Sequence, residues 1–197
     1  MDKYNFGVND QTLLDANILG IETMDELEKA EQFVFLVRSL EIAQGKYVID
    51  AFNMEGLQTL HHYLFGDLYE FAGKIRTVQL TKGATRFCQA QFILSEGARI
   101  FSEMAEEKVW ATIEEAATRL AYFKAELNML HPFREGNGRS IRIFLHQWAK
   151  SKGYYWAYEH LQQDAYLKAM IQSVVTSEEL EQLFLNTLEK NEESTNA

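Results

Sequence analysis

A single proline, Pro132, interrupts the 197 residues of this chain. Proline breaks helices and restricts the residue before it, so a chain with one proline can form long uninterrupted helices. Leu, Ala, Glu, Lys and Gln recur along the chain at steps of three and four residues, which gathers apolar side chains on one helical face. The sequence therefore predicts an all-α, mainly helical fold.

Apolar spacing places the helices along the chain. The first one carries Leu27, Ala30, Val34, Val37 and Leu40 on one face, and we expect that face to be buried. A later helix opens at Thr112 and Glu115, which have the spacing of a capping box, where each side chain binds an otherwise unpaired amide. The predicted ranges are 24–44, 57–64, 93–104, 112–130, 141–149 and 176–188.

One short stretch has β character. Ile75–Leu80 is roughly alternating and β-branched, and Thr85–Cys88 follows after a turn that contains Gly83. This pattern is typical of a small hairpin. We expect it to be the only β element.

Charge and cysteine content limit the function classes. The net charge of −10 works against binding to a nucleic-acid backbone or to anionic lipid. Cys88 is the one cysteine, so an internal disulfide is excluded and a reducing compartment is favoured. The sequence shows no signal peptide and no apolar run of membrane-spanning length. We expect a cytoplasmic protein with no membrane segment and no direct nucleic-acid contact, built as one domain over 1–190 with a loose polar tail at 191–197.

An unusual mixture of residues follows His131 and Pro132. Gly136 and Gly138 flank Asn137 where a helix restarts, so backbone amides can form an anion-binding nest at a helix N-terminus. Two glycines after a helix are more often a plain cap and turn, and a lone histidine is more often an ordinary packing residue. The whole combination is too specific for that explanation and indicates a phosphate site.

Charged residues beside this nest fit a polyphosphate. Arg139 and Arg142 are three residues apart on the opening turn, so we expect both to reach the same side and bind phosphate oxygens. Glu135 supplies one hard oxygen ligand of the kind that Mg²⁺ uses together with substrate phosphates. His131, with an expected pKa near neutral, is suited to take a proton from an attacking hydroxyl.

Taken together, these positions resemble the complete signature of the Fic family, and the segment Leu64–Arg76 is similar to the family's segment before its hairpin. The likeness extends over about residues 45–188. It implies a helical core with a β-hairpin flap over the active site, and transfer of AMP from ATP to Ser, Thr or Tyr of a target protein. The signature is His131-x-Phe133-x-Glu135-Gly136-Asn137-Gly138-Arg139-x-x-Arg142.

The resemblance also implies a role for each position. His131 would be the general base, Glu135 the magnesium ligand and Phe133 an inward-packed anchor of the loop. The anion-binding turn and the phosphate-binding side chains would be Gly136, Asn137, Gly138, Arg139 and Arg142. The flap that registers the target would be Lys82, Gly83, Ala84, Thr85, Arg86, Phe87 and Cys88.

Two details indicate which subgroup of the family the chain resembles. Kinase-like Doc relatives carry a lysine where this chain has Gly138, so the glycine favours AMP transfer. The family's inhibitory pattern, Ser/Thr-x-x-x-Glu-Gly/Asn, does not occur in the printed sequence. The chain thus resembles the toxins that a separate small antitoxin protein inhibits, whose targets tend to be type II topoisomerase subunits.

Other readings stay open. The same site could transfer another nucleotide or a phosphoryl group, or the chain could be a non-catalytic nucleotide-binding regulator. His61 and His62 are neighbours whose side chains diverge by about 100° on a helix, so they cannot share a metal. We expect both to be ordinary helix residues.

Overall fold

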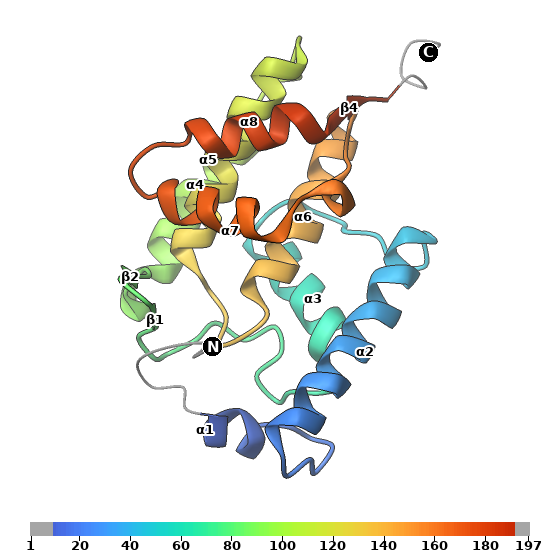
Figure 1. Cartoon of the computed structure of the whole chain (residues 1–197), viewed down its shortest axis with the longest axis vertical. Coiled ribbons are helices and arrows are strands. Elements are labelled where there is room, and N and C mark those ends of the chain that lie inside the picture. Colours follow the sequence, from blue (N-terminus) through green and yellow to red (C-terminus); the bar gives the residue numbers. More distant parts are fainter. Residues whose placement is uncertain (1–9, 192–197) are drawn as a thin grey trace.

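The computed structural model describes residues 10–191, and it confirms a mainly helical chain (Figure 1). The first nine residues of the predicted domain and positions 192–197 of the predicted tail lie outside the described part. No helix within residues 10–191 is long and apolar enough to cross a membrane. The helices are α1 (Asp10–Asp15), α2 (Met24–Ala43), α3 (Met54–Phe65), α4 (Ile93–Glu106), α5 (Ile113–Leu130), α6 (Asn137–Ser151), α7 (Gln163–Gln172) and α8 (Glu178–Thr187).

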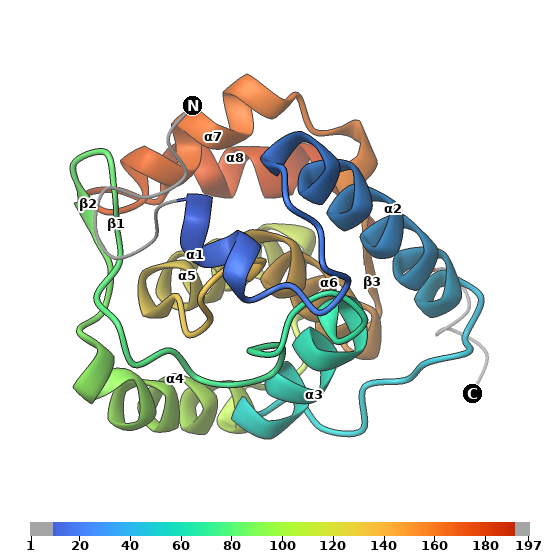
Figure 2. The ribbon, with the colours of Figure 1, turned by 90° about the horizontal axis from the view of Figure 1, so that it is seen from below.

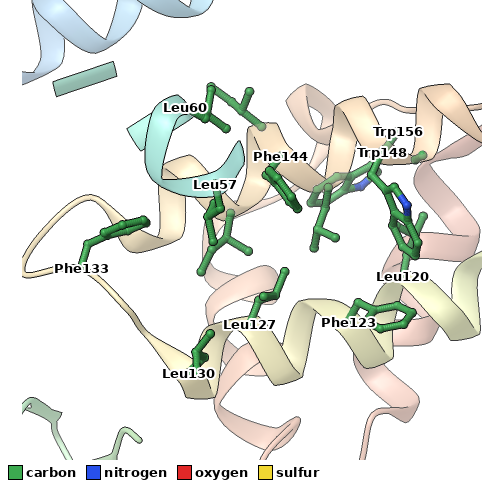
Figure 3. Close-up of a cluster of buried hydrophobic side chains, with 14 of the residues drawn as sticks. Leu57, Leu60, Leu120, Phe123, Leu127, Leu130, Phe133, Phe144, Trp148 and Trp156 are labelled. Carbon is green, nitrogen blue, oxygen red and sulfur yellow. The ribbon is translucent and has the colours of Figure 1, made fainter. Parts of the chain in front are cut away.

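Helices α5 and α6 form the centre of the molecule. They pack against each other, α8 packs on α5, and α3 packs on α6. Figure 2 shows α2, α3, α4, α7 and α8 arranged around this pair. Leu120 and Phe123 of α5 meet Phe144 and Trp148 of α6 in the core, and all four are at most 2% exposed (Figure 3). Each such side chain contributes about 1.5–3 kcal/mol through burial, so the loop that joins α5 to α6 has two firmly anchored ends.

The predicted capping box begins α5. The Thr112 hydroxyl accepts the amide of Glu115 at 3.2 Å, and the Glu115 carboxylate accepts the amide of Ala111 at 2.8 Å. The helix ends where His131 adopts φ 46° and ψ 61°, and His131 is the one non-glycine residue with a positive φ in the described chain. This left-handed geometry costs about 1–2 kcal/mol and turns the chain away from the helix axis.

Two small antiparallel strand pairs accompany the helices. β1 (Thr81–Lys82) pairs with β2 (Thr85–Arg86), with φ 58° at Gly83 in the turn, which confirms a hairpin in this region. The first strand starts later than expected. Ile75–Leu80 is irregular, and β1 begins at Thr81. The expectation of a single β element is wrong, since β3 (Tyr154–Trp156) pairs with β4 (Leu188–Lys190). Strand partners so far apart along the chain leave no local pattern.

Helix α2 buries only part of its apolar face. Its bounds agree with the prediction, and Leu27 is 1% exposed. In contrast, Phe33, Leu36, Val37 and Leu40 are 67%, 56%, 37% and 52% exposed. They follow one another at helical spacing, so we call them the exposed α2 stripe. The prediction that Val37 and Leu40 face the core is wrong, because no described element covers the face of α2 that carries the stripe.

Candidate active site

The loop between α5 and α6 is held in shape by its own side chains. The side-chain oxygen of Asn137 accepts the amide of Phe133 at 2.8 Å, and its side-chain nitrogen donates to the Phe133 carbonyl at 2.7 Å. Asn137 is 1% exposed, and the inward-packed Phe133 is fully buried. The Asn137 side chain is therefore occupied within the loop, and only its backbone is left to take part in an anion-binding turn.

The structure constrains the two glycines of the loop in different ways. Gly136 has φ 76°, and a Cβ added there would lie 2.5 Å from a ring carbon of Phe65. A Cβ at Gly138 would meet no atom within 4 Å. Packing thus demands glycine at 136 but not at 138, where glycine in a helix costs about 0.5–1 kcal/mol relative to alanine. Gly138 leaves the backbone at the start of α6 open, as the predicted approach of a phosphate would require.

The first turn of α6 is open to an anion. No side chain caps this helix N-terminus, and Gly138 is exposed. Uncapped amides and the helix dipole together favour a negative charge at such a position. The structure places Gly136, Asn137 and Gly138 at this helix start, where phosphate binding was predicted.

Arg139 is held by helix α2. Its guanidinium donates to Glu31 at 2.8 Å and lies 3.5 Å from a carboxylate oxygen of Glu135. It also lies over the rings of Phe35 and Phe65, at 5.5 and 4.8 Å from their centroids. Arg139 therefore lies beside the loop, and its charge is already neutralised by Glu31. The sequence pattern did not reveal Glu31 as a partner.

Arg142 contacts other parts of the fold. Its guanidinium lies 5.2 Å from the ring centroid of Tyr158, which belongs to the short 3₁₀ helix η2 (Tyr158–His160). Its Nε is buried and has no hydrogen-bond partner among residues 10–191. The two arginines, expected to share one side of α6, therefore contact different elements.

Glu135 retains a carboxylate oxygen for a ligand. Its Oε1 accepts the amide of Gly136 at 3.0 Å, whereas its buried Oε2 lacks a hydrogen-bond partner in the described chain. Among the described residues there is no group of three or more metal-binding side chains. A single carboxylate oxygen fits Mg²⁺, which completes its shell with phosphate oxygens and water.

His131 is a buried, neutral base. Its Nδ1–H donates to the Asn128 carbonyl at 3.0 Å, and its ring stacks on Phe87 with centroids 3.7 Å apart. Burial, with the nearby charges of Arg76, Lys82 and Lys124, lowers the pKa of His131 to about 3. The prediction of a near-neutral pKa is wrong for this structure, because the flap base and the loop exclude water from the ring.

The sequence pattern did not reveal Arg76, which joins the loop to the flap. Its Nε donates to the His131 carbonyl at 2.7 Å, and its Nη atoms donate to the carbonyls of Val78 and Cys88, both at 2.6 Å. Its backbone amide donates to Pro132 at 2.9 Å. Arg76 is 4% exposed. No local signal marks this role, since the partner carbonyls of Arg76 are far away in the chain or in irregular backbone.

His61 is also part of the site's support. The Gly73 amide donates to its Nδ1 at 2.9 Å, so its Nε2–H donates to the Glu135 carbonyl at 2.8 Å. Complete burial lowers the pKa of His61 to about 4. The prediction of an ordinary helix residue is wrong for His61. Its helical spacing with Leu57, Leu60 and Leu64 was the available signal.

The predicted flap divides into a tip and a base. Lys82, Gly83, Ala84 and Arg86 are exposed and Thr85 is half-buried, so the tip is accessible. Phe87 is 5% exposed against His131, and the Cys88 amide donates to Met129 at 2.9 Å. Phe87 and Cys88 therefore anchor the flap. Burial raises the pKa of the Cys88 thiol, which opposes a nucleophilic role.

A groove of about 440 Å³ opens beside the flap. Residues from the end of the flap, α4 and α5 line it, among them Arg86, Ile100 and Met129. Its position next to the exposed tip extends the surface that a bound protein segment could contact.

The same substitution at the two glycines should have opposite results. Gly136→Ala should lower the free energy of unfolding by about 2–4 kcal/mol through its positive φ and its clash with Phe65. Gly138→Ala should preserve or raise stability by up to about 1 kcal/mol and weaken nucleotide binding. Urea unfolding and calorimetric titration with ATP measure these effects. Unchanged ATP affinity in Gly138→Ala would contradict a ligand at this turn.

Stability should depend on pH through the buried histidines. Below about pH 6.5, His61 and His131 take up protons in the unfolded chain but stay neutral in the folded one, because their folded pKa values lie at about 4 and 3. Each histidine should therefore lower the free energy of unfolding by up to about 1.4 kcal/mol per pH unit as the pH falls from 6.5 toward 4. In urea unfolding between pH 7 and 4, His131→Ala should flatten this dependence. The exposed His160→Ala is the control, and equal slopes in both variants would refute the assignment.

Comparison with known proteins gives the family. The family model described as Fic/DOC family matches residues 51–149. The probable protein adenylyltransferase Fic of Escherichia coli K12 is 33% identical over 78% of this chain and 76% of its own length. The probable protein adenylyltransferase y4lH of Sinorhizobium fredii is 34% identical over 80% and 81%. The protein adenylyltransferase VbhT of Bartonella schoenbuchensis is 34% identical over 91% of this chain, which spans only 39% of VbhT.

Solved structures agree on the fold. The BepC protein of Bartonella tribocorum with bound AMPPNP superposes with a TM-score of 0.79 at 19% identity, over 88% of this chain and 91% of that one. An N-terminal Fic domain of Bartonella quintana with bound ADP gives 0.82 at 20% identity, over 90% and 91%. The chain therefore belongs to the Fic/DOC family and is similar over most of its length to enzymes named protein adenylyltransferases.

Proposed function

We propose that this chain transfers AMP from ATP to a Ser, Thr or Tyr hydroxyl of a target protein. The observation that carries the proposal is a neutral histidine, His131, six residues before the first residue of α6, whose N-terminus has no side-chain cap and whose Gly138 leaves the backbone open. The names of the curated relatives, and the AMPPNP and ADP bound to proteins of the same fold, support a nucleotide as co-substrate.

Each charged group has a task in binding ATP. The amides at the start of α6 bind phosphate oxygens, and Arg142 adds a planar donor. Arg139 joins them when a phosphate competes with Glu31 for its guanidinium. Mg²⁺ held by the open oxygen of Glu135 would neutralise phosphate charge. These interactions place the α-phosphorus for in-line attack.

His131 then acts as the base. A target hydroxyl passes its proton to His131 Nε2 while its oxygen bonds to the α-phosphorus, and the bond from that phosphorus to the bridging oxygen of pyrophosphate breaks. Negative phosphate charge near the ring raises the pKa of His131 from its low starting value, so ATP itself strengthens the base. Strand-like pairing with the exposed flap tip holds the target segment.

Labelled ATP tests the reaction. Incubation of the chain with bacterial lysate, Mg²⁺ and ATP should transfer label from the α-phosphate to protein, and the modified protein should gain one AMP by mass. A purified type II topoisomerase is the first defined substrate to try. His131→Ala should lower the rate by about 10²–10⁴-fold while the chain remains folded, whereas His160→Ala should leave the rate unaltered.

The label also separates the alternatives. Transfer from the γ-phosphate would indicate a kinase instead. Nucleotide binding with no transfer to any protein would indicate a regulator. Full activity in His131→Ala would remove His131 from the mechanism.

We also propose that a separate small antitoxin protein inhibits this chain. The printed sequence lacks the family's inhibitory pattern, and the exposed α2 stripe offers an apolar face to a partner helix. A contiguous apolar face of this kind is typical of an interaction site. The antitoxin would engage Arg142, whose Nε has no partner in the described chain.

Expression without a partner tests this regulation. The chain alone should arrest bacterial growth and modify protein, and His131→Ala at equal abundance should do neither. Growth at the normal rate with unmodified protein, from a chain with an intact site, would contradict inhibition by a separate partner.

A further inference from the structure

His61 of α3 lies between the candidate loop and the segment that leads to the flap, and it is fully buried. Its Nδ1 accepts the Gly73 amide at 2.9 Å, and its Nε2–H donates to the Glu135 carbonyl at 2.8 Å. Its ring contacts those of Phe133 and Phe65, with centroids 3.8 and 5.0 Å away. Hydrogen bonds at both nitrogens and two ring contacts therefore fix the orientation of this side chain.

The peptide bond between Glu135 and Gly136 is held on both sides. Its carbonyl oxygen accepts from His61, and its N–H donates to Oε1 of the Glu135 side chain at 3.0 Å. Gly136 has φ 76° and ψ 1°, the values of the third residue of a type II turn. Rotation of this peptide plane by about 180° would give the third residue of a type I turn, with φ about −90° and ψ about 0°. Glycine adopts both conformations readily, so the local sequence permits either orientation.

The other orientation would disturb the Glu135 carboxylate. The rotated peptide would direct its carbonyl oxygen toward Oε1, and the partial charge of that oxygen would repel the carboxylate. Oε1 would lose its donor, so Oε2, which is buried and has no hydrogen-bond partner among residues 10–191, would no longer be held in place. The hydrogen bond from His61 opposes the rotation, because the rotated peptide would leave Nε2–H buried without its acceptor.

The tautomer of His61 decides whether this hydrogen bond forms. With the proton on Nδ1, Nε2 would present a lone pair to the Glu135 carbonyl, and the contact would be repulsive. The Gly73 amide excludes that tautomer, because an N–H cannot donate to a protonated Nδ1. Gly73 is itself fixed on α3, since its carbonyl accepts from Gln58 at 2.9 Å.

We propose that His61 is a positioning residue that fixes the peptide bond between Glu135 and Gly136 and thereby holds the Glu135 carboxylate ready for Mg²⁺. The proposal rests on the proposed function, because it assumes that this carboxylate binds the metal of Mg²⁺–ATP. His61 acts through Glu135 and does not contact the reacting atoms. Its loss should therefore affect metal-dependent nucleotide binding and leave recognition of the target protein unchanged.

Two substitutions separate this role from general packing. In His61→Gln the amide nitrogen replaces Nε2 and keeps a donor for Glu135. In His61→Asn the shorter side chain keeps an acceptor for Gly73, but no donor reaches Glu135. Both variants lose the ring and one hydrogen bond, so a purely structural role predicts the same result for both.

Calorimetric titration of the intact chain with ATP, once with Mg²⁺ and once with EDTA, tests the proposal. Wild type and His61→Gln should bind ATP about fivefold or more tightly with Mg²⁺ than with EDTA, and His61→Asn should lose most of that gain. In AMP transfer, His61→Asn should raise the KM for Mg²⁺–ATP and leave the KM for the target protein unchanged. His62→Asn, at the exposed neighbouring position, is the matched control and should behave like wild type.

Equal loss of the Mg²⁺ effect in His61→Gln and His61→Asn would assign His61 a general structural role, and an unchanged effect in His61→Asn would overturn the proposal. If His61→Asn fails to fold, ¹⁵N NMR of the wild-type imidazole gives the test. A proton on Nε2 supports the proposal, and a proton on Nδ1 contradicts it.

The same measurements distinguish this proposal from the proposed function. A Mg²⁺ effect on ATP binding that disappears in His61→Asn, in a chain that transfers no AMP, would support the role of His61 and refute the proposed function. AMP transfer with the same KM for Mg²⁺–ATP in wild type and His61→Asn would do the reverse.

Discussion

The guanidinium of Arg76 donates to the backbone of three segments at once: the end of α5 at His131, the irregular segment before the flap at Val78, and the flap base at Cys88. Each of these carbonyls belongs to irregular backbone, which has no helix or sheet partner to satisfy it. A charged, planar donor with several N–H groups can satisfy them together. The position of His131 relative to the flap therefore depends on one buried arginine, and the left-handed geometry of His131 persists because its carbonyl is fixed.

Unbalanced positive charge characterises the interior of the candidate site. His131 is buried as a neutral base, Lys124 has a pKa of about 7, and Arg142 has a buried Nε without a partner. Such groups are unfavourable in a protein that binds nothing. If a nucleotide binds here as proposed, its negative charge raises the pKa of His131. Under the proposed function, the nucleotide thus completes the electrostatics of the fold and prepares the base in the same step.

Helix α2 connects this site to the surface. Its buried Glu31 accepts from Tyr69 at 2.6 Å and holds Arg139 at 2.8 Å, while the exposed α2 stripe covers the outer half of the same helix. A protein bound to the stripe would contact the helix whose Glu31 holds Arg139. This geometry gives a partner a direct physical connection to the site, because one rigid helix carries both the stripe and Glu31.

The sequence by itself determined those features whose causes are local. Helical periodicity gave the positions of α2, α3, α4, α5, α6 and α8 but not of α1 or α7, and the capping box gave the start of α5. The spacing from His131 to Arg142 predicted a phosphate site, and the structure shows that this spacing ends in a helix start. Tertiary structure decided the rest, because the contacts join residues far apart in the chain. It paired β3 with β4, left the outer half of α2 exposed, lowered the pKa of His131 by burial, and brought Lys124 beside Arg142. Burial and long-range pairing depend on which elements meet, and no local pattern encodes that.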